Sequence, residues 1–452
     1  MDFIGLFPLF YFPEIGTAWL MGITGTIHIM ASHTSVGAAL LFVFLAQKAY
    51  REDRPELYTY MKKYGMFLLI FSYVIGSITG PGIWYTATAA SPRGISALIH
   101  NFVWVWATEW VFFVVEVIGV FVLVYFIGKI DRKTHLKITY MFAMASVGTL
   151  ALIIGIISFM MWPGTEAFYI TGSASDAFFG INTFPHMFLR IGFMVMMAAI
   201  IGFVITAAMR KENPELSAEL TRKLAVIGAL GGLGTLVGFA WYVGTLPANA
   251  HDLLQIYLPD VIQTRLITLG AVGLYLMLAF FAPRAIGVTL ASVMILIIGV
   301  VGLWPGEKLR ESMRKPYVAG QYVYSNQIIA RDVPGKGVVS EVEIVAEKGL
   351  LKVNPWVPDR LRVITDENRL EAGELLTKLA CSNCHSMEYD GLYRPLPPKF
   401  AGQNAEMIES FLKDVLAHGA ISYMPKIKLP DDENHAMAVW LESQVNAAQG
   451  GE

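Results

Sequence analysis

The sequence predicts an all-α protein in which a polytopic membrane helix bundle precedes a small all-α domain. Hydrophobic residues make up 55% of the 452 residues and charged residues only 15%, whereas soluble proteins carry about a quarter charged residues. Apolar runs of about 18 residues or more recur, and a run of that length predicts a membrane helix. After about residue 305 the chain becomes polar and rich in Gly and Pro, and no further span follows.

The apolar runs predict eight spans joined by short connections, which favours an antiparallel bundle. The predicted spans cover residues 17–47, 64–88, 99–128, 138–162, 184–209, 222–246, 262–282 and 286–304. Residues 1–16 are aromatic and interrupted by proline, so they suit the membrane interface better than a span.

The loop charges predict the orientation of the bundle. Lys and Arg gather in the loops after the first, third and fifth spans, and the opposite loops contain little beyond Arg93. The residues are Lys48, Arg51, Arg54, Lys62, Lys63, Lys129, Arg132, Lys133, Lys137, Arg210, Lys211, Arg222 and Lys223. Because Lys and Arg flank the cytoplasmic side, we expect both chain ends outside a bacterial inner membrane, with the C-terminal domain in the periplasm.

The change in composition divides the chain into three parts. Residues 1–304 form the predicted bundle, 305–365 a periplasmic linker and 366–452 the small domain. The linker contains an alternating stretch, "GVVSEVEIVAEKG", which favours a short strand. The last part has the pattern of three helices separated by loops.

The stretch "CSNCH" near the end of the chain predicts a covalently bound c-type haem. Cys381 and Cys384 would form the thioethers and His385 would be the proximal ligand. Met424, followed by Pro425, is the expected sixth ligand, and His/Met ligation raises the haem potential. The alternative, a zinc or redox cysteine pair, lacks a second ligand pair, because the chain has only two cysteines. The last part therefore reads as a class I cytochrome c domain, with His418 and His435 on its surface.

Ionisable residues inside the spans are costly in a membrane, so they are functional candidates. They are His28, His33, Glu109, Glu116, His186, Arg190 and Arg265, with His100 at a span mouth and Glu311 just after the eighth span. Histidines within a helical bundle suit haem ligation between facing helices. Any one of them alone is equally well explained as a hydrogen-bonded packing residue, but several beside a c-type haem favour b-type haems.

The segment "GLWPGEKLRESMRKPYV" resembles the end of the eighth span in the large subunit of cytochrome bd quinol oxidases. That family has a Glu, two residues and then Arg-Gln-Pro-Trp, and this chain has Glu311 followed by Arg314-Lys315-Pro316-Tyr317. Further stretches over residues 17–320 resemble the family in the same order. They are "TGTIHIMASHTSVGAALLFVF", with His28 nine residues before Gly37 as in the family, "GSITGPG", "WATEWVFFVVEVIGVF", "MMWPGTEAF", "FPHMF" and "TRLITLG".

The resemblance implies a role for each matching residue. His28 and Glu311 match the axial ligands of paired high-spin haems, and His186 matches one ligand of a low-spin b haem. Arg265 and Arg314 match arginines that support haem propionates. The family's acid beside the haem pair corresponds to Glu109. The expected cofactors are one haem c and two or three b-type, or b/d-type, haems.

Glu116 lies seven residues after Glu109, a spacing that differs by one residue from that of the family. Seven residues apart, the two glutamates lie on the same helix face. In an oxidase the two would relay protons. In a simple electron-transfer protein they would ligate haem or form hydrogen bonds within the bundle.

The chain departs from the family at several places. Ile267 stands where the family's low-spin haem takes a Met, so either His100 or another Met replaces it, or this haem differs or is absent. The long quinol-binding loop after the sixth span is reduced to "GTLPANAHDLLQIYLPD", which leaves His251 and Asp252 as either quinol contacts or solvated loop residues. The family's ninth helix is missing. His33 has no counterpart and is either a second haem ligand or a packed histidine.

Three functions fit these features. The first is electron transfer between the quinone pool, b-type haems and the c-type haem, which exchanges electrons with a periplasmic cytochrome or other redox subunit in either direction. The second is a terminal oxidase that reduces O2 with electrons entering through haem c. The third is a haem-bearing membrane anchor of a larger respiratory complex. The altered low-spin site and the external haem c favour the first. A net charge of −2 without a basic cluster gives no nucleic-acid footprint.

Overall fold

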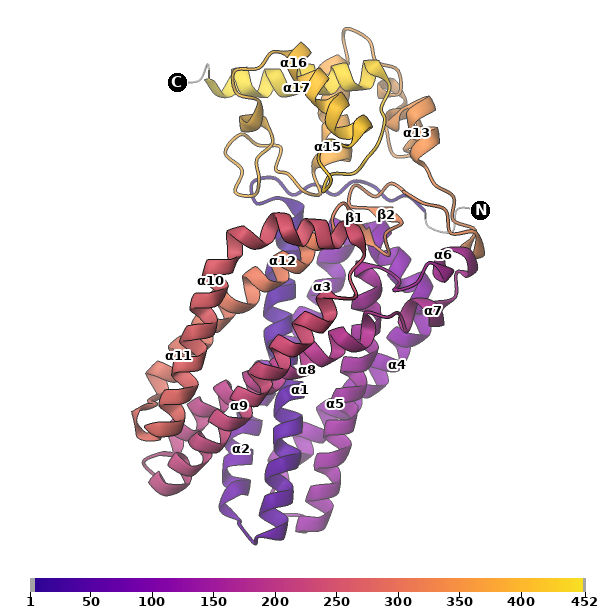
Figure 1. Ribbon diagram of the computed structural model, residues 1–452. Helices are drawn as coiled ribbons and strands as arrows, with labels where there is room; N and C mark the ends of the chain where they lie inside the picture. The colour runs from indigo at the N-terminus through magenta and orange to yellow at the C-terminus, as the bar shows by residue number, and fades with distance from the viewer. Residues whose placement is uncertain (1–4, 450–452) are drawn as a thin grey trace.

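A computed structural model describes residues 5–449, except the side chains of residues 260 and 261. It is an elongated helix bundle with a small helical domain at one end (Figure 1). In the described part, eight helical segments are long and apolar enough to cross a membrane. The predicted all-α polytopic bundle is therefore confirmed.

The spans follow one another along the bundle in the predicted order. Three of them are α1 (Thr17–Arg51), α4 (Pro92–Tyr125) and α5 (Arg132–Met161). The second combines α2 (Glu56–Leu68), a π-helical stretch (Leu69–Ile75) and α3 (Gly76–Ala90). The short helices α6 (Ala167–Thr171) and α7 (Ala174–Phe178) precede α8 (Thr183–Met209). Then come α9 (Pro214–Val243), α10 (Ala248–Phe281), and α11 (Val288–Ile297), which continues through a π-helical stretch (Ile298–Leu303) into α12 (Trp304–Arg314).

The eighth span is longer than predicted. Polar residues begin at Gly306, but the helix continues to Arg314. The helix can continue because the charged side chains of α12 form ion pairs with one another and with Arg190 of α8, as described below. Glu311 therefore lies on the last turns of the span and not beyond it.

Small residues let α8 approach its neighbours closely, as is common between membrane helices. A Cβ on Gly37 of α1 would lie 2.0 Å from the Met194 carbonyl oxygen of α8, and one on Gly231 of α9 would lie 2.6 Å from the Met196 nitrogen. One helical turn from the Gly37 contact lie His33 on α1 and Arg190 on α8. Close packing at Gly37 thus brings these two polar residues together.

The linker, residues 315–365, is folded against the bundle and the C-terminal domain. Its strands β1 (Tyr317–Ala319) and β2 (Val323–Tyr324) pair antiparallel. Two helices follow, α13 (Val342–Lys348) and α14 (Leu350–Val353). The strand predicted in "GVVSEVEIVAEKG" is wrong, because Val342 and Val345, three residues apart, face the same hydrophobic core and so follow a helical period.

The C-terminal domain consists of α15 (Arg369–Cys381), α16 (Ala405–Lys413) and α17 (Asp431–Gln449), joined by loops. The order of helices and loops is as predicted. A Cβ on Gly373 of α15 would lie 2.1 Å from the Ala436 carbonyl oxygen of α17, so these two helices cross in close contact. Trp440 of α17 is buried in the same core.

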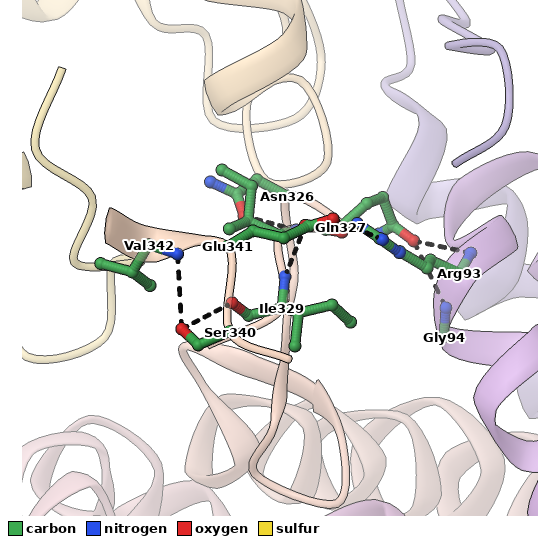
Figure 2. A network of polar contacts seen from close by, with 9 residues as sticks. Arg93, Gly94, Asn326, Gln327, Ile329, Ser340, Glu341 and Val342 are labelled. Atoms are coloured by element: carbon green, nitrogen blue, oxygen red, sulfur yellow. Dashed lines mark hydrogen bonds and ion pairs between the residues drawn. The ribbon is translucent and has the colours of Figure 1, made fainter. Parts of the chain in front are cut away.

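An ion pair fastens the linker to the start of α4 (Figure 2). Arg93 is buried, and its Nη2 lies 2.6 Å from Oε1 of Glu341. The backbone nitrogen of Arg93 donates to Oε1 of Gln327 at 2.9 Å, and its Nη1 donates to the Gln327 carbonyl oxygen at 2.9 Å. The backbone nitrogen of Ile329 donates to Oε2 of Glu341 at 3.1 Å. Two separate parts of the linker are thereby held on one end of the bundle.

We expect Arg93→Met to destabilise this attachment by about 3 kcal/mol, because it leaves a carboxylate partly buried without its counter-charge. Hydrogen–deuterium exchange of residues 326–342 should rise and the thermal midpoint in detergent should fall. Arg284→Met is the control, since the Arg284–Glu215 pair has 70% and 83% of its side chains exposed; it should cost less than about 1 kcal/mol. Equal effects of the two variants would contradict the proposed attachment.

Candidate functional site

A cluster of buried polar residues joins α1 and α8. Arg190 Nε donates to His186 Nε2 at 3.2 Å, and Arg190 Nη1 lies 3.3 Å from His33 Nε2. Ser158 Oγ lies 3.0 Å from His186 Nδ1. Since a guanidinium only donates, His186 carries its proton on Nδ1 and points the Nε2 lone pair into the cluster. His33, His186 and Arg190 are 6%, 1% and 7% exposed.

Glu307 of α12 provides the negative charge of this cluster, and sequence reasoning missed it. Its Oε1 lies 2.6 Å from Arg190 Nη1, and its Oε2 lies 2.9 Å from Arg310 Nε. A buried guanidinium requires such a partner. The available signal was an acid three residues before an arginine, directly after the last apolar run.

Charged residues continue along α12 towards the C-terminal domain. Glu311 forms ion pairs with Arg314 and with Lys315, whose Nζ lies 3.2 Å from Oε1. Lys315 Nζ also lies 3.3 Å from Sγ of Cys384. A single helix thus leads from the His186 cluster to the "CSNCH" motif.

The arginines of this region fit the haem that the sequence predicts. Among the described residues, Arg265 Nη2, Arg310 Nη1 and Arg314 Nε are buried nitrogen atoms without a hydrogen-bond partner. A buried donor without an acceptor costs about 1–3 kcal/mol of stability, so these nitrogen atoms require acceptors. Haem propionates would supply these acceptors. Gly306 places no side chain beside Arg265, since a Cβ added there would lie 3.8 Å from Arg265 Nη1.

His28 lies closer than His33 to the N-terminal end of α1, and it contacts α3. Its Nδ1 lies 3.1 Å from Thr79 Oγ1, which leaves Nε2 for a metal. Gly80 adjoins the ring, since a Cβ there would lie 3.5 Å from His28 Cε1. These contacts are suitable for an axial histidine beside a flat macrocycle.

The two glutamates of α4 occupy different environments. Glu109 is half-buried, whereas Glu116 is 4% exposed. Tyr73 donates to Glu116 Oε2 at 3.3 Å and lies 2.7 Å from Ser35 Oγ. Glu116 therefore belongs to a polar line between α4, the second span and α1, and this line is separate from the Arg190 contacts.

Four predicted positions lie outside the cluster. Ile267 is 71% exposed, so its position faces away from the bundle core. His100 is exposed on α4, and its Nδ1 lies 2.8 Å from the Ser96 carbonyl oxygen. His251 and Asp252 lie on the first turns of α10. His135, which sequence reasoning missed, is buried in α5, with its ring centroid 5.0 Å from that of Tyr58.

The C-terminal domain presents the predicted haem c residues on and after α15. His385 Nδ1 lies 3.0 Å from the Arg394 carbonyl oxygen, so Nε2 is the nitrogen available for iron. Burial lowers the pKa of His385 to about 4, which keeps the imidazole neutral as ligation requires. Cys381 and Met424 both pack against the core of this domain. His418 and His435 have side chains that are 75% and 42% exposed, away from that core.

Aromatic rings form a second link between the bundle and the C-terminal domain. Ring centroids of Trp304 (α12) and Trp19 (α1) are 5.2 Å apart, and those of Trp19 and Tyr393 are 5.8 Å apart. Tyr393 directly precedes Arg394, whose carbonyl oxygen faces His385. Tyr257 of α10 contacts Tyr423, next to Met424, at 5.9 Å. Segments carrying both expected iron ligands therefore contact the bundle (Figure 1).

No protein-family model matches the chain, and no curated protein sequence matches it. Among solved structures it is similar to the bd oxidase from Geobacillus thermodenitrificans. The TM-score is 0.57 at 14% sequence identity, over 73% of this chain and 91% of that chain. At this identity the likeness shows the fold alone: the chain shares the helix-bundle fold of that oxidase chain.

We expect Glu307→Gln to destabilise the protein by about 3–5 kcal/mol, because it leaves the buried Arg190 and the partly buried Arg310 guanidinium without a counter-charge. Glu212→Gln is the control, since Glu212 pairs at 2.6 Å with Lys63 on the surface; it should cost less than about 1 kcal/mol. Thermal unfolding in detergent measures both. A Glu307 variant as stable as the control would show that the cluster is not held by this ion pair.

Proposed function

We propose that this protein transfers electrons in a bacterial respiratory membrane, between b-type haems in the bundle and a c-type haem on the C-terminal domain. It would exchange electrons with the quinone pool and with a periplasmic cytochrome or other redox subunit. The observation that carries this proposal is the continuity of α12. Glu307 and Glu311 lie on the same helix that leads to Lys315, whose Nζ lies 3.3 Å from Cys384.

Residues of the bundle would hold the haems through imidazole, carboxylate and guanidinium groups. His28 and Glu311 are the proposed ligands of the paired haems. His186 would ligate the low-spin haem, with His33 as its proposed partner in place of Ile267. Because Arg190 donates to Nε2 of both rings, its side chain would have to leave these nitrogens when the haem binds. When bound, the haems supply reversible one-electron chemistry at iron.

The arginines would position these haems through charge. Arg265, Arg310 and Arg314 each have a buried nitrogen without a partner among the described residues, and a haem propionate would supply an acceptor for it. The Arg190 guanidinium fixes the tautomer of His186, and the Arg394 carbonyl fixes that of His385. In the C-terminal domain, Cys381 and Cys384 would anchor haem c covalently, with His385 and Met424 as its axial ligands.

The terminal-oxidase alternative has its own supporting observation. Glu116, Tyr73 and Ser35 form a buried line of proton-exchanging groups between the helices. With Glu109 on the same helix, such a line would deliver protons to an oxygen-reducing site. Electrons would then enter through haem c, and Glu109 and Glu116 would be its catalytic acids.

Haem content and ligand binding test the proposal. A pyridine haemochrome assay should show both b-type and c-type haem, and Cys381→Ala with Cys384→Ala should remove only the c-type signal. His186→Ala should lower the b-type signal without affecting haem c. Absence of b-type haem would refute the membrane-haem proposal. A dithionite-reduced spectrum that carbon monoxide leaves unchanged would contradict the oxidase alternative, whereas oxygen uptake lost in Glu311→Ala would favour it.

The aromatic contacts predict a fast route between the two haem regions. Trp19→Leu should slow electron exchange several-fold, because it removes the ring between Trp304 and Tyr393, whereas Trp19→Phe should retain most of the rate. Flash photoreduction of haem c by a soluble ruthenium complex, followed at the b-type haem absorbance, measures this exchange.

Trp84→Leu is the matched control, since Trp84 makes an edge-to-face contact with Trp106 within the bundle. Haem reduction potentials should be the same in all of these variants. An unchanged rate in Trp19→Leu would rule out the aromatic route without affecting the proposed haems.

A further inference from the structure

The N-terminal segment, residues 5–16, runs between the bundle and the C-terminal domain before the chain enters α1 (Figure 1). The indole nitrogen of Trp356 in the linker donates to the Leu6 carbonyl oxygen at 3.1 Å. Tyr11 packs against the core of the C-terminal domain. Further contacts of the segment reach one loop of that domain, residues 386–394, which follows directly after the haem motif.

Tyr11 binds the first half of this loop. Its hydroxyl donates to the Glu388 carboxylate and accepts from the Met387 backbone nitrogen at 2.9 Å. Ser386 Oγ donates to the same carboxylate oxygen at 2.8 Å. Burial, and then the hydrogen bond to Glu388, raise the pKa of Tyr11 to about 12, so the hydroxyl remains a donor at neutral pH. The residues directly after the proximal haem ligand are therefore held by a side chain from the opposite end of the chain.

Glu14 and Gly16 bind the second half of the loop. The Leu392 backbone nitrogen donates to the Glu14 carbonyl oxygen at 2.8 Å. Gly16 has a φ of +75°, which disfavours other residues, and a Cβ added there would lie 3.4 Å from Tyr393 Cβ. The two halves of the loop are joined to each other as well, since the Ser386 backbone nitrogen donates to the Tyr393 carbonyl oxygen at 3.0 Å.

These contacts reach His385 through Arg394, the residue after Tyr393. The Arg394 carbonyl oxygen is the acceptor for His385 Nδ1, at 3.0 Å. A hydrogen bond at the far nitrogen of a metal-bound imidazole fixes the ring and makes it a better electron donor to the metal. A better donor stabilises oxidised iron more than reduced iron. The position of this loop therefore affects the reduction potential of a haem bound to His385.

We propose that the N-terminal segment is part of the haem c site, and that Tyr11 and Gly16 position the proximal ligand His385 through the loop that follows it. The segment continues directly into α1, the helix that carries His28. The ligand loop of haem c is thereby fixed to the first helix of the bundle. The effect on a haem rests on the proposed function, whereas the contact of the segment with residues 386–394 does not.

Removal of the Tyr11 hydroxyl tests the positioning role in the full chain. In Tyr11→Phe the amides of residues 386–394 should exchange with deuterium several-fold faster, because the Met387 nitrogen loses its acceptor. The Arg394 carbonyl is then held less firmly, so the reduction equilibrium of haem c should shift about threefold towards the reduced form. A redox titration followed at the c-type absorbance measures this shift. Tyr389→Phe is the matched control, since this hydroxyl of the same loop has no hydrogen bond to another described residue.

Gly16→Val perturbs the same loop from its other half. The new side chain would press on Tyr393 and would disfavour the positive φ of residue 16, so haem c should again become easier to reduce. Gly5→Val is the control for this variant, because a Cβ at Gly5 meets no atom within 4 Å. Two independent variants keep the test available if one of them does not fold.

The outcomes separate the role of the segment from the proposed function. Faster exchange in residues 386–394 together with easier reduction of haem c in both variants, but in neither control, supports the positioning role. An unchanged potential overturns it. A lower potential also overturns it, because the segment would then only shield the haem from water. A purified chain without haem c would refute the proposed function, whereas unchanged exchange in residues 386–394 would refute the hold of the segment on the loop, with or without haem.

Discussion

The buried carboxylate of Glu307 is the interaction on which the membrane part of the site depends. It neutralises Arg190 from α8 and Arg310 from its own helix, at 2.6 Å and 2.9 Å. Without it, the His33–Arg190–His186 contacts would concentrate positive charge in a region of low dielectric constant, where an unpaired ion is strongly unfavourable. The same ion pair ties α12 to α8, and so determines where the later part of α12 leaves the bundle.

Two features of the backbone bring the residues of this cluster together. Gly37 allows α1 and α8 to approach until a Cβ would overlap the Met194 carbonyl oxygen, and this contact lies one turn from the polar cluster. The last span then continues as helix through its charged residues to Arg314. Helix geometry places residues three or four apart on one side, so Glu307, Arg310, Glu311 and Arg314 form a charged stripe that ends beside the C-terminal domain.

The sequence was sufficient for features that depend on composition or local spacing. The lengths of the apolar runs predicted eight spans. The short spacing within "CSNCH" was enough to place two cysteines and a histidine close together, at the end of α15. The role of Glu307 could not be predicted, because its main partner, Arg190, lies more than a hundred residues earlier and only the tertiary fold brings the two side chains within ion-pair distance. Residues 342–348 were mispredicted as a strand for a related reason: alternation and a helical period both fit so short a stretch, and the core contacts of Val345 decide between them.

The "CSNCH" segment meets the bundle where the charged stripe ends. Lys315, directly after the stripe, contacts Cys384. Trp19 of α1 contacts Tyr393, a few residues after the same segment. The Arg93–Glu341 pair holds the linker on the same end of the bundle. The segment is therefore positioned by a charged contact from α12 and an aromatic contact from α1, while a separate ion pair fixes the linker that leads to it.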